Sequence, residues 1–334
     1  MPKLWVSGSL DVLKLMAKHG ADLHTADSRG RTPLHIACLH VRPDVVKWLL
    51  MSGADVVKVD KEGKTALDLV DDEYGSEFDS QPIVILSLLD HGAGLNTDTS
   101  ALFKRACQIG CYGIVKILLG RRAAGSDTKP LSEALYDVSA LYSAAMVRLL
   151  IQHGATVAEA DEGHEERPCL VRAVGSNDPV CLEVIAALLD NGADVNKTGQ
   201  QQKAALAYTC EKGNMKTIKL LIARGADTGA VDVIGNTALL SASAGGKIEV
   251  FKLLLASGAD VEQANRDGNT PLILAAQNKK TNRIRPLLEA GADVTVTNNA
   301  GETALDYFAD NTAMLELCGG YLDRNMGSRK PLLK

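Results

Sequence analysis

Apolar residues along this chain recur at the three- and four-residue spacing of amphipathic helices, and the helical stretches come in pairs. The second stretch of a pair carries a Val-Val-Lys-x-Leu-Leu type of pattern, as in residues 44–50, 113–119 and 249–255. Several of these stretches run into a glycine, which is typical of a helix C-terminus because glycine adopts the left-handed conformation at little cost. The pattern therefore predicts many short helices separated by glycine-containing turns.

The tripeptide Gly-Ala-Asp follows these second helices at a fixed period. The first two clean copies are 33 residues apart, and so are the last four. Self-similarity at this period indicates a stacked repeat protein, in which each repeat packs on its neighbours and no separate core is needed. Clean copies begin at Gly20, Gly53, Gly192, Gly225, Gly258 and Gly291, and degraded copies begin at Gly92 and Gly154.

Each regular repeat opens with a turn and a helix start. The turn contains Asp and Gly, as at residues 27–30, 60–63 and 232–235, and its glycine tolerates the positive φ of a tight reversal. Thr-Pro-Leu or Thr-Ala-Leu follows. Threonine caps a helix, and proline suits the first helical position, where an N–H has no partner. The caps predicted in this way are Thr32, Thr65, Thr237, Thr270 and Thr303.

These motifs resemble the ankyrin repeat, whose mark is Thr-Pro-Leu-His-x-Ala in a 33-residue frame. Residues 32–37, Thr-Pro-Leu-His-Ile-Ala, are a full copy, and the resemblance covers roughly residues 4–318. It implies an all-α repeat solenoid: helix-turn-helix units joined by short β-hairpin fingers, with a concave binding face.

The repeats are not uniform along the chain. We expect a single array of about nine to ten units over residues 1–320, followed by a basic tail at 321–334. The first unit is truncated to its second helix, and a long insert lies near residues 70–82. The units at about 98–199 are irregular because they lack the Gly-x-Thr turn.

Composition narrows the class of protein. The net charge of −5 argues against general nucleic-acid affinity, and no apolar run approaches the roughly 18–20 residues of a membrane span. The seven cysteines are an odd number, and Cys38, Cys107 and Cys210 occupy the same small-residue position of three first helices. This usage is typical of a reduced compartment. With no secretory signal at the start, we expect an intracellular protein of the cytoplasm or nucleus.

Three groups of residues invite a chemical interpretation. Cys107 and Cys111 could supply two sulfur ligands, but Gly110 is expected to end the helix between them. Residues 161–166 mix carboxylates with a histidine, and we interpret them as a solvated acidic loop. His35 occupies a repeat position where, in the ankyrin pattern, the histidine bonds around the threonine cap. We therefore expect no catalytic residue, no metal site and no cofactor, and we predict that the chain is not an enzyme.

The leading hypothesis is a non-enzymatic interaction scaffold or adaptor that binds another protein through its concave face and fingers. The alternative is a targeting or substrate-recognition array that is part of a larger enzyme, ubiquitin ligase or channel. The truncated first unit motivates this alternative. Fold alone does not decide between the two.

Turn positions and the acidic insert are the predicted binding surface. Apolar residues at a turn facing water are candidate anchors, and carboxylates that flank aromatics suit a basic partner segment. The alternatives are packing of the apolar pair on a neighbouring finger and a merely solubilising insert. The turn candidates are Arg29, Arg31, Lys61, Glu62, Lys64, Val233, Ile234, Asn236 and Asn269; those of the insert are Asp71, Asp72, Tyr74 and Phe78.

One modification site is also suggested. Leu188 followed after five residues by Asp-Val-Asn resembles the substrate pattern of the factor-inhibiting asparaginyl hydroxylase on ankyrin repeats. Asn196 is the candidate hydroxylation site. The simpler interpretation is that Asn196 only ends a repeat loop.

Overall fold

The computed structural model describes residues 9–70, 81–94, 99–122, 126–140, 143–175, 181–308 and 311–328. It divides into two compact parts, an N-terminal array (residues 1–127) and a C-terminal array (residues 128–334). The boundary falls inside the stretch that we expected to be irregular. That residues 1–320 form one continuous array stays a prediction.

The N-terminal array is a series of short helices in pairs. Helix α3 packs on α4, α6 packs on α7, and α4 and α7 both contact α5. In the third repeat the first helix is only one 3-10 turn, η1, and the insert at residues 71–80 lies outside the described residues. The elements are α2 (Leu10–Lys18), α3 (Pro33–Leu39), α4 (Pro43–Met51), η1 (Asp68–Val70), α5 (Gln81–Asp90), α6 (Ser100–Gln108) and α7 (Tyr112–Gly120).

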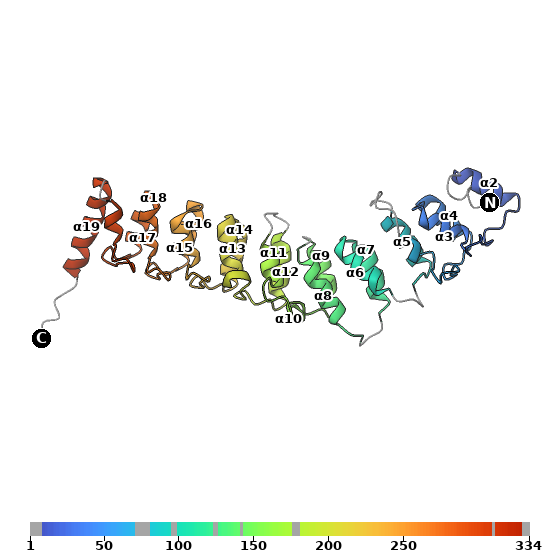
Figure 1. Cartoon of the computed structure of the whole chain (residues 1–334), viewed down its shortest axis with the longest axis horizontal. Helices are drawn as coiled ribbons and strands as arrows, with labels where there is room; N and C mark the ends of the chain where they lie inside the picture. The colour runs from blue at the N-terminus through green and yellow to red at the C-terminus, as the bar shows by residue number, and fades with distance from the viewer. Residues whose placement is uncertain are drawn as a thin grey trace. The chain divides into compact units, whose positions relative to one another are not determined.

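The C-terminal array repeats the same pairing more regularly (Figure 1). Its helices are α8 (Lys129–Val138), α9 (Ala144–Gln152), α10 (Val157–Ala160), α11 (Cys169–Val174), α12 (Cys181–Asp190), η2 (Gln200–Gln202), α13 (Ala205–Lys212), α14 (Met215–Ala223), α15 (Ala238–Ala244), α16 (Ile248–Ala256), α17 (Pro271–Gln277), α18 (Thr281–Glu289), η3 (Ala304–Phe308) and α19 (Thr312–Ser328). None of the helices within the described ranges combines the length and apolar character needed to cross a membrane.

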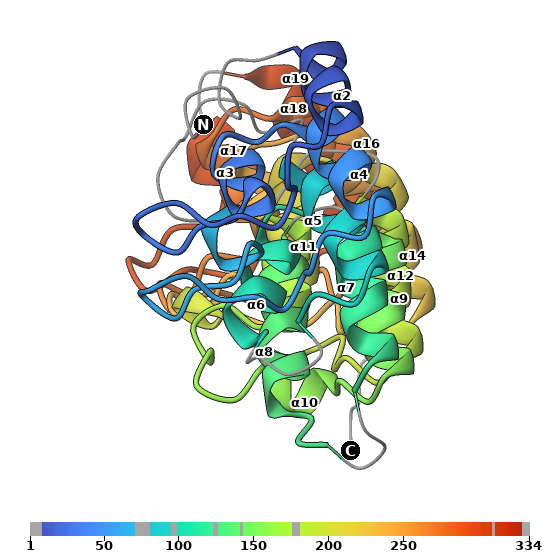
Figure 2. The ribbon, with the colours of Figure 1, turned by 90° about the vertical axis from the view of Figure 1, so that its right-hand side faces the viewer.

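Two rows of helices form this array. The first helices α11, α13, α15, α17 and η3 contact one another in order, and the second helices α9, α12 and α14 do the same. Seen end-on, α9, α12 and α14 lie together on one side and α8 and α11 on the other (Figure 2). The apolar stripe of each helix is buried between the rows; Leu150, Leu221 and Leu254, for example, are all 0% exposed. The predicted all-α stack is confirmed.

The fingers are tighter than the expected hairpins. Within the described residues the fingers are turns. Two of them contain an isolated antiparallel bridge, Val59 with Thr65 and Thr198 with Ala204, and none contains an extended strand. The longer spacing between Gly154 and Gly192 includes the additional helix α10, which packs on α8.

Helix capping differs between neighbouring repeats. The Thr237 hydroxyl accepts a hydrogen bond from the Leu240 N–H at the start of α15 (3.1 Å). The equivalent residue before α13 is Ala204, which makes no side-chain cap bond. In the same finger Gln202 replaces the turn glycine and has a φ of 57°, a conformation that glycine adopts more easily.

We predict that Ala204→Thr raises the free energy of unfolding of the chain by about 1 kcal/mol, because it supplies the missing acceptor for α13. Thr237→Ala should lower it by a similar amount. Urea denaturation of both variants measures the two changes. Ala204→Val is the matched control, since valine has the shape of threonine without its oxygen. A valine variant as stable as the threonine variant would contradict the capping explanation.

Candidate functional site

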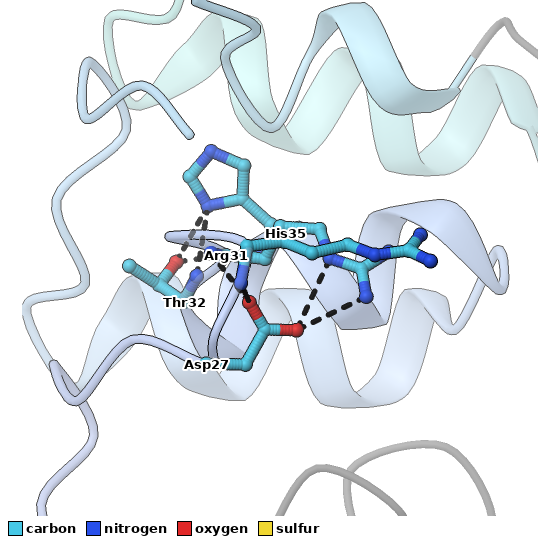
Figure 3. Close-up of polar contacts among 5 residues, drawn as sticks. Asp27, Arg31, Thr32 and His35 are labelled. Carbon is cyan, nitrogen blue, oxygen red and sulfur yellow. Dashed lines mark hydrogen bonds and ion pairs between the residues drawn. The ribbon is translucent and has the colours of Figure 1, made fainter. Parts of the chain in front are cut away.

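The finger turns are held by the carboxylate or amide at their first position. The Asp27 Oδ1 atom accepts hydrogen bonds from the N–H groups of Arg29 (2.8 Å) and Arg31 (2.9 Å). The Arg31 guanidinium then folds back onto Asp27 Oδ2 at 3.0 Å (Figure 3). Burial opposes ionisation of Asp27, but the bonds from Arg31 and Arg29 outweigh it and lower the pKa of the carboxyl. Arg31 is therefore partly committed within its own finger.

Successive fingers are joined by single backbone bonds. The Lys61 N–H donates to the Arg29 carbonyl (2.9 Å), and the Arg266 N–H donates to the Ile234 carbonyl (3.2 Å). The same bond links Asn299 to Asp267 at 3.0 Å. These bonds satisfy backbone groups that would otherwise face water, and they fix the spacing of the finger tips.

The turn glycines are required by this close approach as well as by their conformation. A Cβ atom on Gly235 would lie 2.9 Å from the backbone nitrogen of Arg266 in the next finger. Gly301, in the last finger, has a similar φ (78° against 81°), yet no described atom lies within 4 Å of its Cβ position. Comparison of Gly235 with Gly301 therefore separates the backbone strain caused by a side chain from its clash with the next finger.

We predict that Gly235→Ala destabilises the C-terminal array more than Gly301→Ala does. Both variants place alanine in the left-handed region, which costs about 1–2 kcal/mol of folding free energy. Only the first also pushes the next finger away. Equilibrium unfolding of the two variants measures the difference, and equal losses would mean that the inter-finger bond yields without cost.

His35 connects two repeats through both ring nitrogens. Its Nδ1 atom accepts from the Thr32 N–H (3.2 Å) and contacts the Thr32 hydroxyl at 2.8 Å (Figure 3). Because Nδ1 accepts, the proton is on Nε2, which donates to the Lys64 carbonyl at 3.2 Å. The structural role expected for His35 is confirmed, and burial lowers its pKa despite the Lys64 carbonyl.

This geometry makes the stability of the N-terminal array depend on pH. The folded state favours neutral His35, so its contribution is present above the unfolded pKa of about 6.5 and is lost as the pH falls through the lowered folded value. We predict that the protection factors of the amides around residues 32–37, which are exchange rates corrected for the intrinsic pH dependence, fall between pH 7 and pH 5. Hydrogen exchange against His35→Gln, which has no titrating group there, measures it. The same pH response in both proteins would contradict this role.

The fingers of the last repeats are tied by amide side chains. Asn265 Nδ2 donates to Asn236 Oδ1, and Asn298 Nδ2 donates to Asn269 Oδ1, both at 3.0 Å. Asn269 is only 9% exposed. Asn269, one of the predicted binding residues, is therefore nearly buried, and its amide oxygen is an acceptor for the next finger.

The other predicted binding residues lie at different depths. Val233 is 36% exposed and Ile234 56% exposed, so neither side chain is buried on a neighbouring finger. Arg29, Lys61 and Glu62 are exposed, whereas Arg31, Lys64 and Asn236 are half-buried. The insert residues Asp71, Asp72, Tyr74 and Phe78 lie outside the described residues.

Asn196 bridges two repeats. Its Oδ1 atom accepts from the Asp227 N–H (2.8 Å), and its Nδ2 atom donates to the Gly225 carbonyl (3.3 Å). The residue is nevertheless exposed. The side chain therefore does more than end a loop, since it caps the turn of the following repeat.

The segment at residues 161–166 is not entirely a solvated loop. Asp161 is 6% exposed, accepts from the Cys169 N–H at 2.7 Å and pairs with Lys197 at 3.2 Å. It positions the start of α11, so the interpretation was wrong for this residue. His164 stacks on Tyr136 with ring centroids 3.6 Å apart. Glu162, Glu165 and Glu166 are exposed.

Cys107 and Cys111 are separated as expected. Cys107 is buried in α6, which ends at Gln108, and Gly110 has the left-handed φ of 76°. Within the described ranges no three His, Cys, Asp or Glu residues are grouped so as to hold a metal ion. The six cysteines whose side chains are described form no disulfide with one another.

No binding residue was predicted by number on the solvent side of the first helices. This side includes Lys203, Glu211, Glu302 and Tyr307 of the C-terminal array. The sequence contains a signal that could have identified these residues. When the repeats are aligned, some first-helix positions stay polar or small while their neighbours stay apolar.

Comparison with known proteins identifies the repeat. A family model of ankyrin repeats in three copies matches residues 170–265, and one of many copies matches residues 16–70 and 253–308. The chain is 28% identical to ankyrin repeat protein nuc-2 of Neurospora crassa over 238 residues, or 64% of this chain and 20% of that protein.

Two shorter similarities concern proteins of other descriptions. Protein phosphatase 1 regulatory subunit 27 of Homo sapiens is 44% identical over 69 residues, which are 21% of this chain and 45% of that protein. Ankyrin repeat and SOCS box protein 6 of Mus musculus is 29% identical over 144 residues, which are 42% of this chain and 34% of that protein. The chain thus spans less than half the length of each of these relatives.

Proposed function

Because this chain belongs to the ankyrin repeat proteins, we propose that it is a non-enzymatic scaffold or adaptor that binds a partner protein through its finger tips and first helices. The fold supports this proposal, since repeats that bury their apolar residues between two helix rows leave turns and outer helix positions free to vary. The partner is a protein and neither a nucleic acid nor a membrane, in keeping with the net charge of −5. Cysteines that form no disulfide with one another are consistent with an intracellular location.

The observation that carries the proposal is the exposed apolar pair Val233 and Ile234. Their finger is held at both sides by backbone bonds, Val233 N–H to the Gln201 carbonyl (3.0 Å) and Arg266 N–H to the Ile234 carbonyl (3.2 Å). Two apolar side chains are thus presented to water on a rigid backbone. Such an arrangement favours binding, because little conformational freedom is lost when a partner covers them.

We predict that Val233→Asp with Ile234→Asp reduces partner capture at least tenfold, about 1.4 kcal/mol, as expected for loss of a buried anchor. Affinity purification from the native host with quantitative mass spectrometry measures it. A separate variant lacking residues 71–79 tests the acidic insert. Val57→Asp is the control, since it makes the same kind of change at an exposed apolar residue (50% exposed) outside the predicted surface. If both test variants stay folded and capture the same partners as the parent, neither surface is the binding site.

The second candidate function is substrate recognition or targeting within a larger assembly. Two relatives are described as a regulatory subunit of protein phosphatase 1 and as a protein with a SOCS box. This motivates a search for catalytic subunits in the same purification. A phosphatase or ligase subunit that co-purifies in stoichiometric amount would favour the second candidate, and partners without any enzyme would favour the scaffold.

Asn196 remains our candidate for hydroxylation, with one structural condition. Its amide bonds to Asp227 and Gly225 must be released before an enzyme can approach the side chain. We predict that incubation with a recombinant asparaginyl hydroxylase adds one oxygen to the peptide with Asn196, and that Asp227→Pro, which removes the N–H that donates to Asn196 Oδ1, speeds this reaction. Peptide mass spectrometry measures both. No mass shift on this peptide in either protein would end the proposal.

A further inference from the structure

The first helices of the C-terminal array present a row of solvent-accessible side chains on their outer side. The residues at these outer positions follow one another every three residues and are exposed or half-buried, whereas the positions between them are largely buried. We call this surface the first-helix face. Its residues are Tyr208 and Glu211 on α13, Ser241 and Ala244 on α15, Leu274 and Gln277 on α17, and Tyr307 on η3.

The middle of this face is hollow. Ser241 occupies the position that Tyr208 holds in the preceding repeat and Leu274 in the following one. The smaller side chain leaves a hollow of about 180 Å³ between α13 and α15. Its lining includes Ala238, Ser241, Ala242, Val250, Glu211 and Lys247. A hollow of this size has room for one aliphatic side chain.

The two charged groups at the hollow already have partners. Glu211 Oε1 accepts from Lys203 Nζ at 2.6 Å, and Lys247 Nζ donates to the Gly213 carbonyl at 3.4 Å. Because Lys203 already neutralises Glu211, a basic side chain entering the hollow would lose water without gaining an unpaired opposite charge. An uncharged aliphatic side chain fits its small apolar walls better.

Glu302 offers a fixed negative charge on the same face. Its Oε2 atom accepts from the Tyr307 hydroxyl and from Asn298 Nδ2 (3.1 Å), and Gln277 in turn donates to the Tyr307 oxygen at 2.8 Å. The bonds from Tyr307 and Asn298 lower the pKa of Glu302, so it is ionised at neutral pH. No cation among the described residues pairs with it.

The spacing of the two features defines what can bind both. The hollow lies between the repeats of α13 and α15, and Glu302 belongs to the repeat of η3. Packed helices are about 8–10 Å apart, and two and a half such spacings separate the hollow from η3, so the two features are roughly 20–25 Å apart. An extended chain covers this distance in about six to eight residues.

We propose that the first-helix face binds an extended segment of the partner that places an aliphatic side chain in the hollow and a lysine or arginine at Glu302, about six to eight residues away. This inference rests on the proposed function, because it names the chemistry of the partner. The hollow supplies contact with apolar surface, and the oriented carboxylate supplies register through a charge-assisted hydrogen bond.

Selection from a displayed library of random peptides on the full chain tests this specificity. The parent should enrich peptides with an aliphatic and a basic residue at the stated spacing. Glu302→Gln should lose the preference for the basic residue at least tenfold and keep the aliphatic one, since the glutamine oxygen still accepts from Tyr307. Ser241→Phe, which fills the hollow, should do the reverse. Ser241→Ala leaves the hollow open and is the matched control.

The outcomes separate the inference from the proposed function. Enrichment of other residues by the parent, no enrichment at all, or the same enrichment by parent and both test variants would overturn the inference. The captured partner from the affinity purification is then tested against the same variants. A partner that binds all of them equally leaves the scaffold function standing and overturns this site. No partner captured by any variant or by the parent would instead contradict the scaffold function.

Discussion

No repeat of this protein can bury its own apolar residues, and this constraint underlies the rest of the structure. The paired helices are each about seven to ten residues long, as α15 (Ala238–Ala244) and α16 (Ile248–Ala256) illustrate. Helices of this length are marginal in water on their own. Leu239 and Leu254 are 0% exposed because α13, α17 and α18 cover the repeat from either side. Stability is therefore a property of neighbours, and every repeat depends on the register of the next one.

The fingers maintain that register with only a few hydrogen bonds. One backbone bond per finger, such as Arg266 N–H to the Ile234 carbonyl, sets the distance between repeats. Amide and carboxylate side chains then fix rotation, as Asn269 and Asn298 do. Because backbone atoms and inner side chains make these bonds, the side chains at the finger tips are not needed to hold the repeats together. Val233 and Ile234 can thus be apolar and exposed without weakening the stack.

The sequence predicted the repeat, the helix pairs and the caps because these features are local and recur in register. Thr32 with His35, and the glycines at positive φ such as Gly235, needed only residue type and spacing. The first-helix face could not be predicted in the same way, because its hollow depends on which repeats lie side by side. Ser241 is small in every alignment, but only the packing of α13 against α15 turns it into a cavity wall. The burial of Asp161 and Asn269 was missed for a related reason: a polar residue in a loop is read as solvated unless its partners from other repeats are known.

Polar networks explain why the two ends of the first-helix face differ in charge while the fold stays the same. At the position before the helix cap, Lys203 pairs with Glu211 inside one repeat, Asn236 and Asn269 are held by neutral amides, and Glu302 is held by a tyrosine and an amide. Each of these arrangements gives the side chain before the cap a hydrogen-bond partner, so all of them are compatible with the stacked repeats. They differ in what remains: a paired charge, a neutral dipole, or a carboxylate with no cationic partner among the described residues. Specificity for a partner can therefore change at these positions without loss of the register that the backbone bonds maintain.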